Sequence, residues 1–257
     1  MCTVVILRRP GAAWPLVLGA NRDEMTGRAA AAPARHWPDR PHVTGGLDRL
    51  AGGTWLAVGD QGMVAAVMNR AGSLGPAPGM RSRGDLPLLA LDHASAAEAA
   101  EHLAGRNAEL YRPFNLVVAD AAQAFWLARR EADEAIACQA IPPGLSMLTA
   151  HDLNDMAGSR RIRHFLPRFR AAAAPDPAAG GWGAWPALLA ATDPAPDGGA
   201  MDAMTIRPQG GFATVSSSLV ALGGGAGGPR IAWHFADGSP DSAPFGPVAG
   251  LPGALRD

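Results

Sequence analysis

The residue with the clearest chemical potential in this chain is Cys2, directly after the initiator Met1. A cysteine side chain is small enough for Met1 to be removed during synthesis, which would leave Cys2 with a free α-amino group. Such an amine has a pKa of about 7.7–8.0 and can act as a base near neutral pH. A thiol beside its own amine is a nucleophile with a built-in base. The alternative is a buried cysteine at the start of an edge strand.

A second group of chemically capable residues follows the apolar segment 16–18: Asn21, Arg22, Asp23 and Glu24. Residues 3–7 and 16–18 flank a Pro-Gly turn and are predicted to form a hairpin. The end of its second strand would lie beside the start of the first, close to Cys2. There Arg22 would lower the pKa of the thiol, and Asp23 would hold the α-amine or orient Arg22. The alternative is a solvated strand end with local ion pairs.

The elements that position these residues are predicted as strand pairs separated by helices. The expected strands are 54–58 with 63–69, 114–119 with 124–128, 212–222 with 230–235, and 145–149. The expected helices are 85–91, 94–103 and 159–173. Residues 25–53 are expected to form a long loop, 174–200 a Pro/Gly/Ala-rich insert, and the tail from about 238 to be irregular. This order favours antiparallel sheets covered by helices in a single domain spanning 1–257.

Composition limits the function classes. The chain has 257 residues, 48% of them hydrophobic, and a net charge of -1, which excludes an intrinsically disordered chain and gives no general attraction to nucleic acid. Two cysteines in a chain of this length are not expected to form a disulfide framework. The first residues are not expected to form a signal peptide. No segment reaches the roughly 20 apolar residues of a membrane-spanning helix. We therefore expect a cytoplasmic protein.

Metal binding and other sites have weaker support. No pair among the seven histidines has metal-site spacing with a supporting acid, so we expect no metal and no cofactor. Cys138 lies in a strand-like segment and is expected to be inert. Arg160, Arg161 and Arg163 are expected on the solvated face of a helix whose other face is apolar. The alternative is that they contact an anionic group, if that helix borders the cleft.

Ordered motifs extend the pattern beyond the N-terminus. Ala-Asn-Arg-Asp-Glu ends at residue 24, and further blocks lie at 52–56, 62–70, 81–86, 114–120 and 144–146. In this order they resemble the NRDE family, also called transport-and-Golgi-organisation-2-like proteins. The blocks cover roughly residues 1–150.

This resemblance implies a fold and a chemistry. The family is similar to N-terminal-nucleophile (Ntn) hydrolases of the penicillin V acylase and bile salt hydrolase kind. It implies an α+β αββα sandwich, with two stacked, mainly antiparallel sheets flanked by helices, that cleaves linear amide C–N bonds.

The resemblance also implies site roles. Cys2 would be the nucleophile, Arg22 and Asp23 its supporting pair, and Asn69 an oxyanion donor. Four further residues of the same motifs are expected to contact the substrate: Asn21, Glu24, Arg70 and Arg83.

The chain departs from the family pattern at two positions. Met147 stands where the family usually has Asn, although Asn154 is near enough in sequence to reach back, and Val215 stands where an Arg often precedes two serines. The expected ligand is a small-molecule amide. The alternative is a non-catalytic binding or trafficking protein for haem or acyl-lipid (acyl-CoA) on the same fold.

Overall fold

The computed structural model describes residues 2–177, 181–225 and 227–253. The chain divides into two compact units, one formed by residues 1–28 with 143–257 and the other by residues 29–142. The first unit therefore contains both ends of the chain, and the second is inserted into it.

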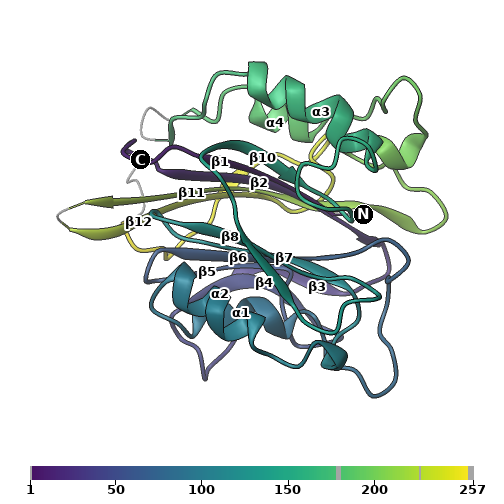
Figure 1. Cartoon of the computed structure of the whole chain (residues 1–257). Helices are drawn as coiled ribbons and strands as arrows, with labels where there is room; N and C mark the ends of the chain where they lie inside the picture. Colours follow the sequence, from purple (N-terminus) through teal and green to yellow (C-terminus); the bar gives the residue numbers. More distant parts are fainter. Residues whose placement is uncertain (1, 178–180, 226, 254–257) are drawn as a thin grey trace. The chain divides into compact units, whose positions relative to one another are not determined.

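The first unit is built on a six-stranded antiparallel sheet with the order β10-β1-β2-β11-β12-β13 (Figure 1). Its strands are β1 (Thr3–Arg8), β2 (Leu16–Met25), β10 (Gly144–Leu148), β11 (Phe212–Gly225), β12 (Gly228–Ala236) and β13 (Gly246–Pro247). The predicted N-terminal hairpin is confirmed, because β1 and β2 pair with Thr3 opposite Asn21. This register places the end of β2 beside the start of β1.

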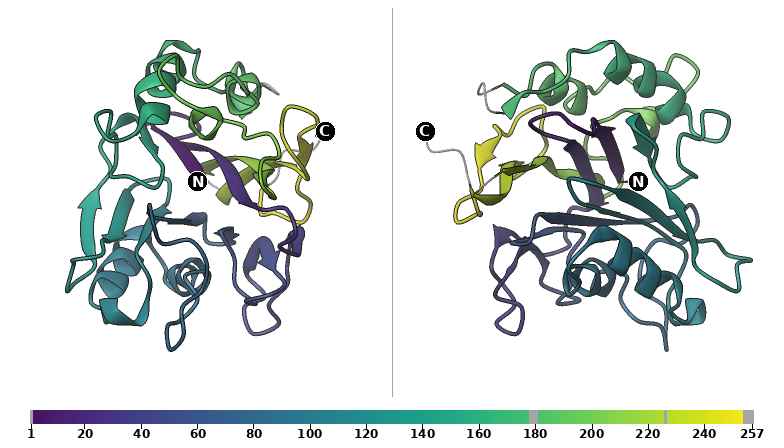
Figure 2. Two further views of the ribbon diagram at one scale, coloured as in Figure 1. Left: turned by 90° about the vertical axis from the view of Figure 1, so that its right-hand side faces the viewer. Right: turned by 60° about the vertical axis from the view of Figure 1, so that its left-hand side comes forward.

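Helices cover one face of this sheet (Figures 1 and 2). They are α3 (Arg160–Ala171), α4 (Trp185–Leu189) and the short 3-10 helix η3 (Ala200–Asp202). The Ser159 side chain caps α3 by accepting a hydrogen bond from Ile162 N, as a helix-starting serine commonly does. The apolar face of α3 packs against α4, where Phe169 and Trp185 meet edge to face. The packing of α3 fixes which of its residues lie over the sheet.

The second unit contains a seven-stranded antiparallel sheet with the strands in chain order. Its strands are β3 (Ala30–Ala34), β4 (Val43–Asp48), β5 (Leu56–Gly59), β6 (Met63–Asn69), β7 (Phe114–Ala119), β8 (Ala124–Arg129) and β9 (Ala137–Ala140). Its helices are α1 (Asp85–Leu91), α2 (Ala96–Ala104) and the 3-10 helix η1 (Ala108–Leu110). Helices α1 and α2 pack on one face of this sheet and enclose its apolar core.

The predicted α+β class with two mainly antiparallel sheets is confirmed. The prediction of a long loop over 25–53 was wrong, because β3 and β4 lie within it. The Pro/Ala composition hid β3, an edge strand whose register shifts between Ala31 and Ala34, around Pro33. Proline is tolerated at such an edge, where its missing N–H breaks no ladder.

Two other segments contain more structure than expected. Helix α4 lies within the Pro/Gly/Ala-rich insert, and β13 lies in the tail and pairs with β12. The glycine run at 223–228 forms the tip of the β11–β12 hairpin, as predicted, with residue 226 outside the described residues. No helix in the described part of the chain combines the length and apolar character needed to cross a membrane.

Candidate active site at the start of β1

Cys2 lies immediately before β1, beside the end of β2. Its Sγ is 3.5 Å from the carbonyl oxygen of Asp23, so the hairpin brings the thiol to the polar cluster. The thiol is partly buried. Cys2 and the 21–24 cluster therefore share one end of the first unit's sheet.

The Asp23 carboxylate is the most enclosed charged group at this end of the sheet, with an exposed fraction of 2%. Its Oδ1 accepts a hydrogen bond of 2.6 Å from Thr214 Oγ1 on β11, and its Oδ2 accepts one of 2.9 Å from Arg161 Nη1 on α3. Burying a carboxylate is costly unless its charge is balanced and its oxygens are hydrogen-bonded. The structure meets both conditions with residues distant in sequence.

Arg161 corrects a prediction. It was expected on the solvated face of its helix, but only 3% of it is exposed and it forms a buried ion pair with Asp23. The expectation failed because Arg161 was grouped with its charged neighbours. Residues four apart share a helix face, and Arg161 lies four residues before the core residue Phe165 and eight before Phe169. This spacing could have predicted from the sequence that Arg161 lies on the buried face of the helix.

Alternation along β2 explains which cluster residues meet the helices. Successive side chains of a strand point to opposite faces, so Asn21 and Asp23 share one face and Arg22 points to the other. Asn21 Nδ2 donates to the carbonyl oxygens of Leu189 and Met204 at 2.9 and 2.8 Å. Asn21 Oδ1 accepts from Ser217 Oγ at 2.6 Å. The amide of Asn21 thus joins β2 to the segments that carry Leu189 and Met204.

The other two cluster residues lie nearer the surface. Arg22 is 7% exposed and pairs with Ser216 in the register of β2 and β11. Glu24 is partly exposed, accepts a hydrogen bond from Met25 N, and lies 3.8 Å from Arg28. Glu24 therefore lies at the partly exposed edge of the 21–24 cluster.

The pKa of the Cys2 thiol is raised above its ordinary value. Burial of the thiol is the largest cause, and the negative charge of Asp23 adds to it. Arg22 lowers this pKa in the expected direction, but burial and Asp23 outweigh it. Arg22 thus acts on this pKa in the predicted direction without deciding the net shift, and the thiol needs a base to become a nucleophile.

The two departures from the family pattern have distinct surroundings. Val215 lies at an irregularity in β11, between Thr214 opposite Asp23 and Ser216 opposite Arg22. Such bulges redirect neighbouring side chains. Met147 is fully buried in β10 and pairs with β1. Neither position supplies a polar group to the reactive end.

Asn154 does reach back to β10. Its Oδ1 accepts from Met147 N at 2.8 Å, and its Nδ2 donates to Ser146 Oγ at 3.2 Å. Its φ of 57° lies in the left-handed region, which asparagine tolerates better than most residues. Asn154 thus holds the 149–158 segment against β10.

Three predicted site residues belong to the second unit. Asn69 ends β6 and pairs with Phe114 of β7. Arg70 Nη1 donates to Asn115 Oδ1 at 2.7 Å. Arg83 donates to the Ser73 and Pro113 carbonyl oxygens at 2.8 and 3.0 Å, among other acceptors, and so ties together loops of this unit.

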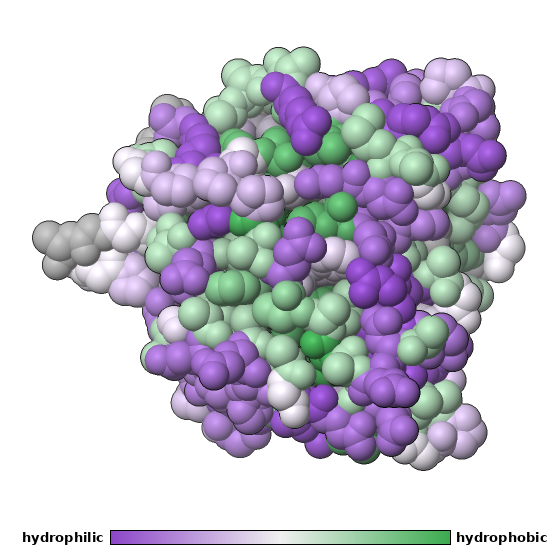
Figure 3. Space-filling view, viewed as in Figure 1, coloured by the Kyte–Doolittle hydropathy of each residue, from purple (hydrophilic) through white to green (hydrophobic). Residues whose placement is uncertain are grey.

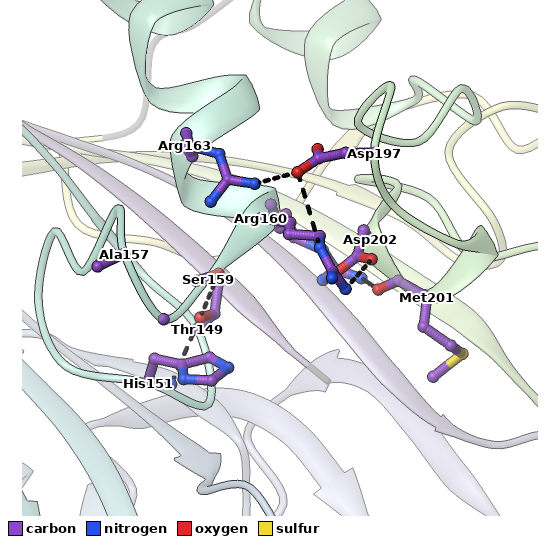
Figure 4. A pocket seen from close by; sticks show the side chains of 11 residues that line it. Thr149, His151, Ala157, Ser159, Arg160, Arg163, Asp197, Met201 and Asp202 are labelled. Carbon is purple, nitrogen blue, oxygen red and sulfur yellow. Dashed lines mark hydrogen bonds and ion pairs between the residues drawn. The ribbon is translucent and has the colours of Figure 1, made fainter.

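A polar pocket of about 410 Å³ opens beside Arg161 in the first unit (Figure 4). The pocket is lined by residues from three segments, which are residues 149–163, the loop at Asp197, and η3. The lining residues are Thr149, His151, Ala157, Gly158, Ser159, Arg160, Arg161, Arg163, Asp197, Met201 and Asp202. Arg163 pairs with Asp197 at 2.5 Å across it. Figure 3 shows hydrophilic and hydrophobic side chains intermixed over the part of the surface that carries α3. Arg161, but not Cys2, lines this pocket.

The described residues contain no group of three His, Cys, Asp or Glu side chains placed to hold a metal ion.

The sequence is similar to proteins of one known family. The sequence profile of Transport and Golgi organisation 2 matches residues 1–172. A Transport and Golgi organization protein 2 homolog from Bos taurus is 38% identical over 113 residues, covering 42% of this chain and 40% of that protein. A Mus musculus homolog is 35% identical over 115 residues with the same coverage. The chain thus spans about 40% of the length of the curated relatives it matches.

A solved structure shares the fold. A variant of the conjugated bile acid hydrolase from Clostridium perfringens is similar with a TM-score of 0.50 at 11% sequence identity, covering 100% of this chain and 99% of that one. At this identity the similarity concerns the fold alone.

Proposed function

We propose that this chain, which belongs to the Transport and Golgi organisation 2 family, hydrolyses a linear amide with Cys2 as its nucleophile. One observation carries the proposal: the Cys2 thiol contacts the backbone carbonyl oxygen of Asp23, a residue whose buried carboxylate is paired with Arg161. Replacing a buried ion pair with apolar residues is often neutral or stabilising, so packing alone gives little reason to keep one. The activity named for the Clostridium perfringens protein makes hydrolysis the reaction to test first.

The proposed reaction begins with removal of Met1, which leaves a free amine on Cys2. The amine takes the thiol proton, and the thiolate attacks the amide carbonyl carbon. The C–N bond then breaks, the leaving nitrogen receives the proton, and the acyl group stays on Cys2 as a thioester. Water attacks this thioester, releasing a carboxylic acid and restoring the thiol. The raised pKa of Cys2 supports this route, because a protonated thiol requires an adjacent base.

Each remaining site residue has a proposed part. Asp23 holds the protonated amine, and Arg22 moderates the negative potential around the thiol. Asn69 is assigned as the oxyanion donor from its place in the family pattern, and a side-chain donor of this kind is worth about 2.7–4 kcal/mol when lost. Glu24 is retained as a substrate contact. Arg70 and Arg83 hydrogen-bond within the second unit, so their proposed part is to support its loops.

The test uses protein whose intact mass shows that Met1 has been removed. It is screened against N-acyl amino acids, acyl-homoserine lactones and β-lactams, with release of the free amine or opening of the ring as the readout. We expect turnover of at least one N-acyl compound. The Cys2→Ala variant should lose it, and the Cys138→Ala variant should keep it, because Cys138 is exposed on the edge strand β9.

Titrations with haem and acyl-CoA run in parallel and address the non-catalytic alternative. Stoichiometric binding of either ligand by processed protein, without hydrolysis of any amide, would replace the amidase proposal with the binding one. Retention of Met1 in protein from its native host would also contradict the amidase proposal, since the base would then be blocked.

A further inference from the structure

The ion pair of Asp23 and Arg161 joins more than two side chains. Arg161 Nη1 also donates to Thr3 Oγ1 at 2.7 Å, and Nη2 donates to the Met201 carbonyl oxygen at 2.8 Å. Thr3 follows Cys2 directly in β1, and Asp23 lies beside Cys2 on β2. One guanidinium from α3 therefore contacts both strands at the point where the thiol is placed.

The planar shape of the guanidinium suits this task. Its donors project in a fixed fork, so binding Thr3, Asp23 and Met201 at once determines where each lies. A lysine ammonium is a single point of charge and cannot reproduce the three directions together. The contacts thus fix the position of the Asp23 carboxylate and place a positive charge against it.

The charges near the Cys2 thiol explain why a cation at Arg161 matters. Without Arg161, the negative charge of Asp23 would be less fully balanced near the thiol, which would disfavour the thiolate. Arg22 lies next along β2, but alternation directs its side chain to the other face of the sheet. Val215, at the β11 irregularity opposite, has no charge. Arg161, by contrast, is bound directly to the Asp23 carboxylate.

We propose that Arg161 is a positioning residue for the Cys2 reaction, holding the Asp23 carboxylate where it receives the α-amino group of Cys2. This rests on the proposed amidase function. Arg161 acts through Asp23 and Thr3 and touches no reacting atom. Its role is to keep the amine, and hence the base, in place beside the thiol.

The first experiment compares Arg161→Gln, Arg161→Lys and Arg163→Gln in processed protein. Arg163 is the matched control, since it lies on the same helix and lines the same pocket but pairs with Asp197 at the surface. We expect Arg161→Gln to lower kcat about 10²-fold with little change in KM, because misplaced catalytic groups cost about that much. Arg161→Lys should fall between it and wild type, and Arg163→Gln should stay within about twofold of wild type.

Rescue by a small molecule separates positioning from general folding. In Arg161→Ala, the pocket beside the vacated side chain gives free guanidinium a route to Asp23. Added guanidinium at millimolar concentration should raise kcat of this variant at least several-fold and leave Asp23→Asn unchanged. A folded Arg161→Ala protein whose activity is equal to wild type, or which no guanidinium concentration improves, would overturn the proposal.

A second readout needs no turnover and so distinguishes this proposal from the amidase proposal. The rate of Cys2 alkylation is followed against pH in wild type, Arg161→Gln and Arg163→Gln. Loss of the cation should move the midpoint of Cys2 labelling upward by about one pH unit. At a fixed pH below the midpoint, labelling should then be about tenfold slower. The same midpoint in Arg161→Gln and wild type would contradict the positioning role even if the chain proved to be an amidase. If Arg161→Gln does not fold, Arg161→Lys carries the same test, with a smaller upward shift expected.

Discussion

Arg161 Nη1 lies 2.9 Å from Asp23 Oδ2, although 138 residues separate them in the sequence. The pair is buried, and it joins α3 to β2 at the end of the sheet that carries Cys2.

Removing one partner of the pair should destabilise the protein strongly. Arg161→Met leaves the Asp23 carboxylate buried without its cation, which typically costs about 3–5 kcal/mol. The double variant Asp23→Asn with Arg161→Met should be less destabilised than the sum of the single variants, because neither partner then remains charged and alone. Urea unfolding of the two single variants and the double variant measures this coupling.

The control for this prediction is Arg163→Met. Its pair with Asp197 is exposed, so its loss should cost no more than about 1 kcal/mol. An Arg161→Met protein as stable as Arg163→Met would show that the buried pair contributes nothing.

Asn21→Leu should destabilise the first unit. The change removes the donor to Met204 O and the acceptor for Ser217 Oγ, and an unpaired buried polar group costs about 1–3 kcal/mol. Asn107→Leu serves as the control, because Asn107 caps η1 at the surface. Thermal unfolding followed by circular dichroism should show the larger fall in Tm for Asn21→Leu. Equal falls in the two variants would argue against the structural role of Asn21.

The pH dependence of Cys2 labelling should report its raised pKa. The thiolate is the reactive form, so the labelling rate should rise through a midpoint above the ordinary thiol value. Asp23→Asn removes a negative charge that raises this pKa, so the midpoint should fall. Arg22→Gln removes a charge that lowers it, so the midpoint should rise.

The labelling measurement uses iodoacetamide, mass spectrometry and a Cys138→Ala background. Protein that retains Met1 is compared with processed protein, so that the effect of the free amine is separated from that of Asp23 and Arg22. Movement of the midpoint in the same direction for Asp23→Asn and Arg22→Gln would contradict the assigned charges.

Substitutions of the proposed nucleophile and oxyanion donor should have different kinetic effects. Cys2→Ala should abolish amide turnover, whereas Cys2→Ser should keep a small remnant, because a hydroxyl beside the same amine is a poorer nucleophile. Asn69→Ala should lower kcat by roughly 10²–10³ with little change in KM, since its hydrogen bond forms fully only to the oxyanion. Steady-state kinetics on the best N-acyl substrate measures both effects. A rise in KM alone for Asn69→Ala would reassign Asn69 to substrate binding.

The sequence by itself determined the local parts of this fold. Two apolar runs on either side of a Pro-Gly turn were enough to predict the β1–β2 hairpin, and with it the approach of Cys2 to the end of β2. The helix beginning after Ser159 was predicted from its apolar spacing, and the structure adds the serine cap. These features depend on residues a few positions apart, whose preferences and periodicity are readable without knowledge of the remaining chain.

Only the tertiary structure decided which partners the polar residues meet. Alternation shows that Asn21 and Asp23 share a face, but not that helices cover it. Asn21 bonds carbonyl oxygens 168 and 183 residues away, and Asp23 pairs with an arginine that sequence analysis assigned to solvent. Such pairings depend on how α3 and the segment after α4 dock on the sheet, and docking is set by the summed packing of apolar faces. The pKa of Cys2 likewise depends on the folded surroundings, because burial is the largest cause of its rise and, together with the charge of Asp23, outweighs Arg22.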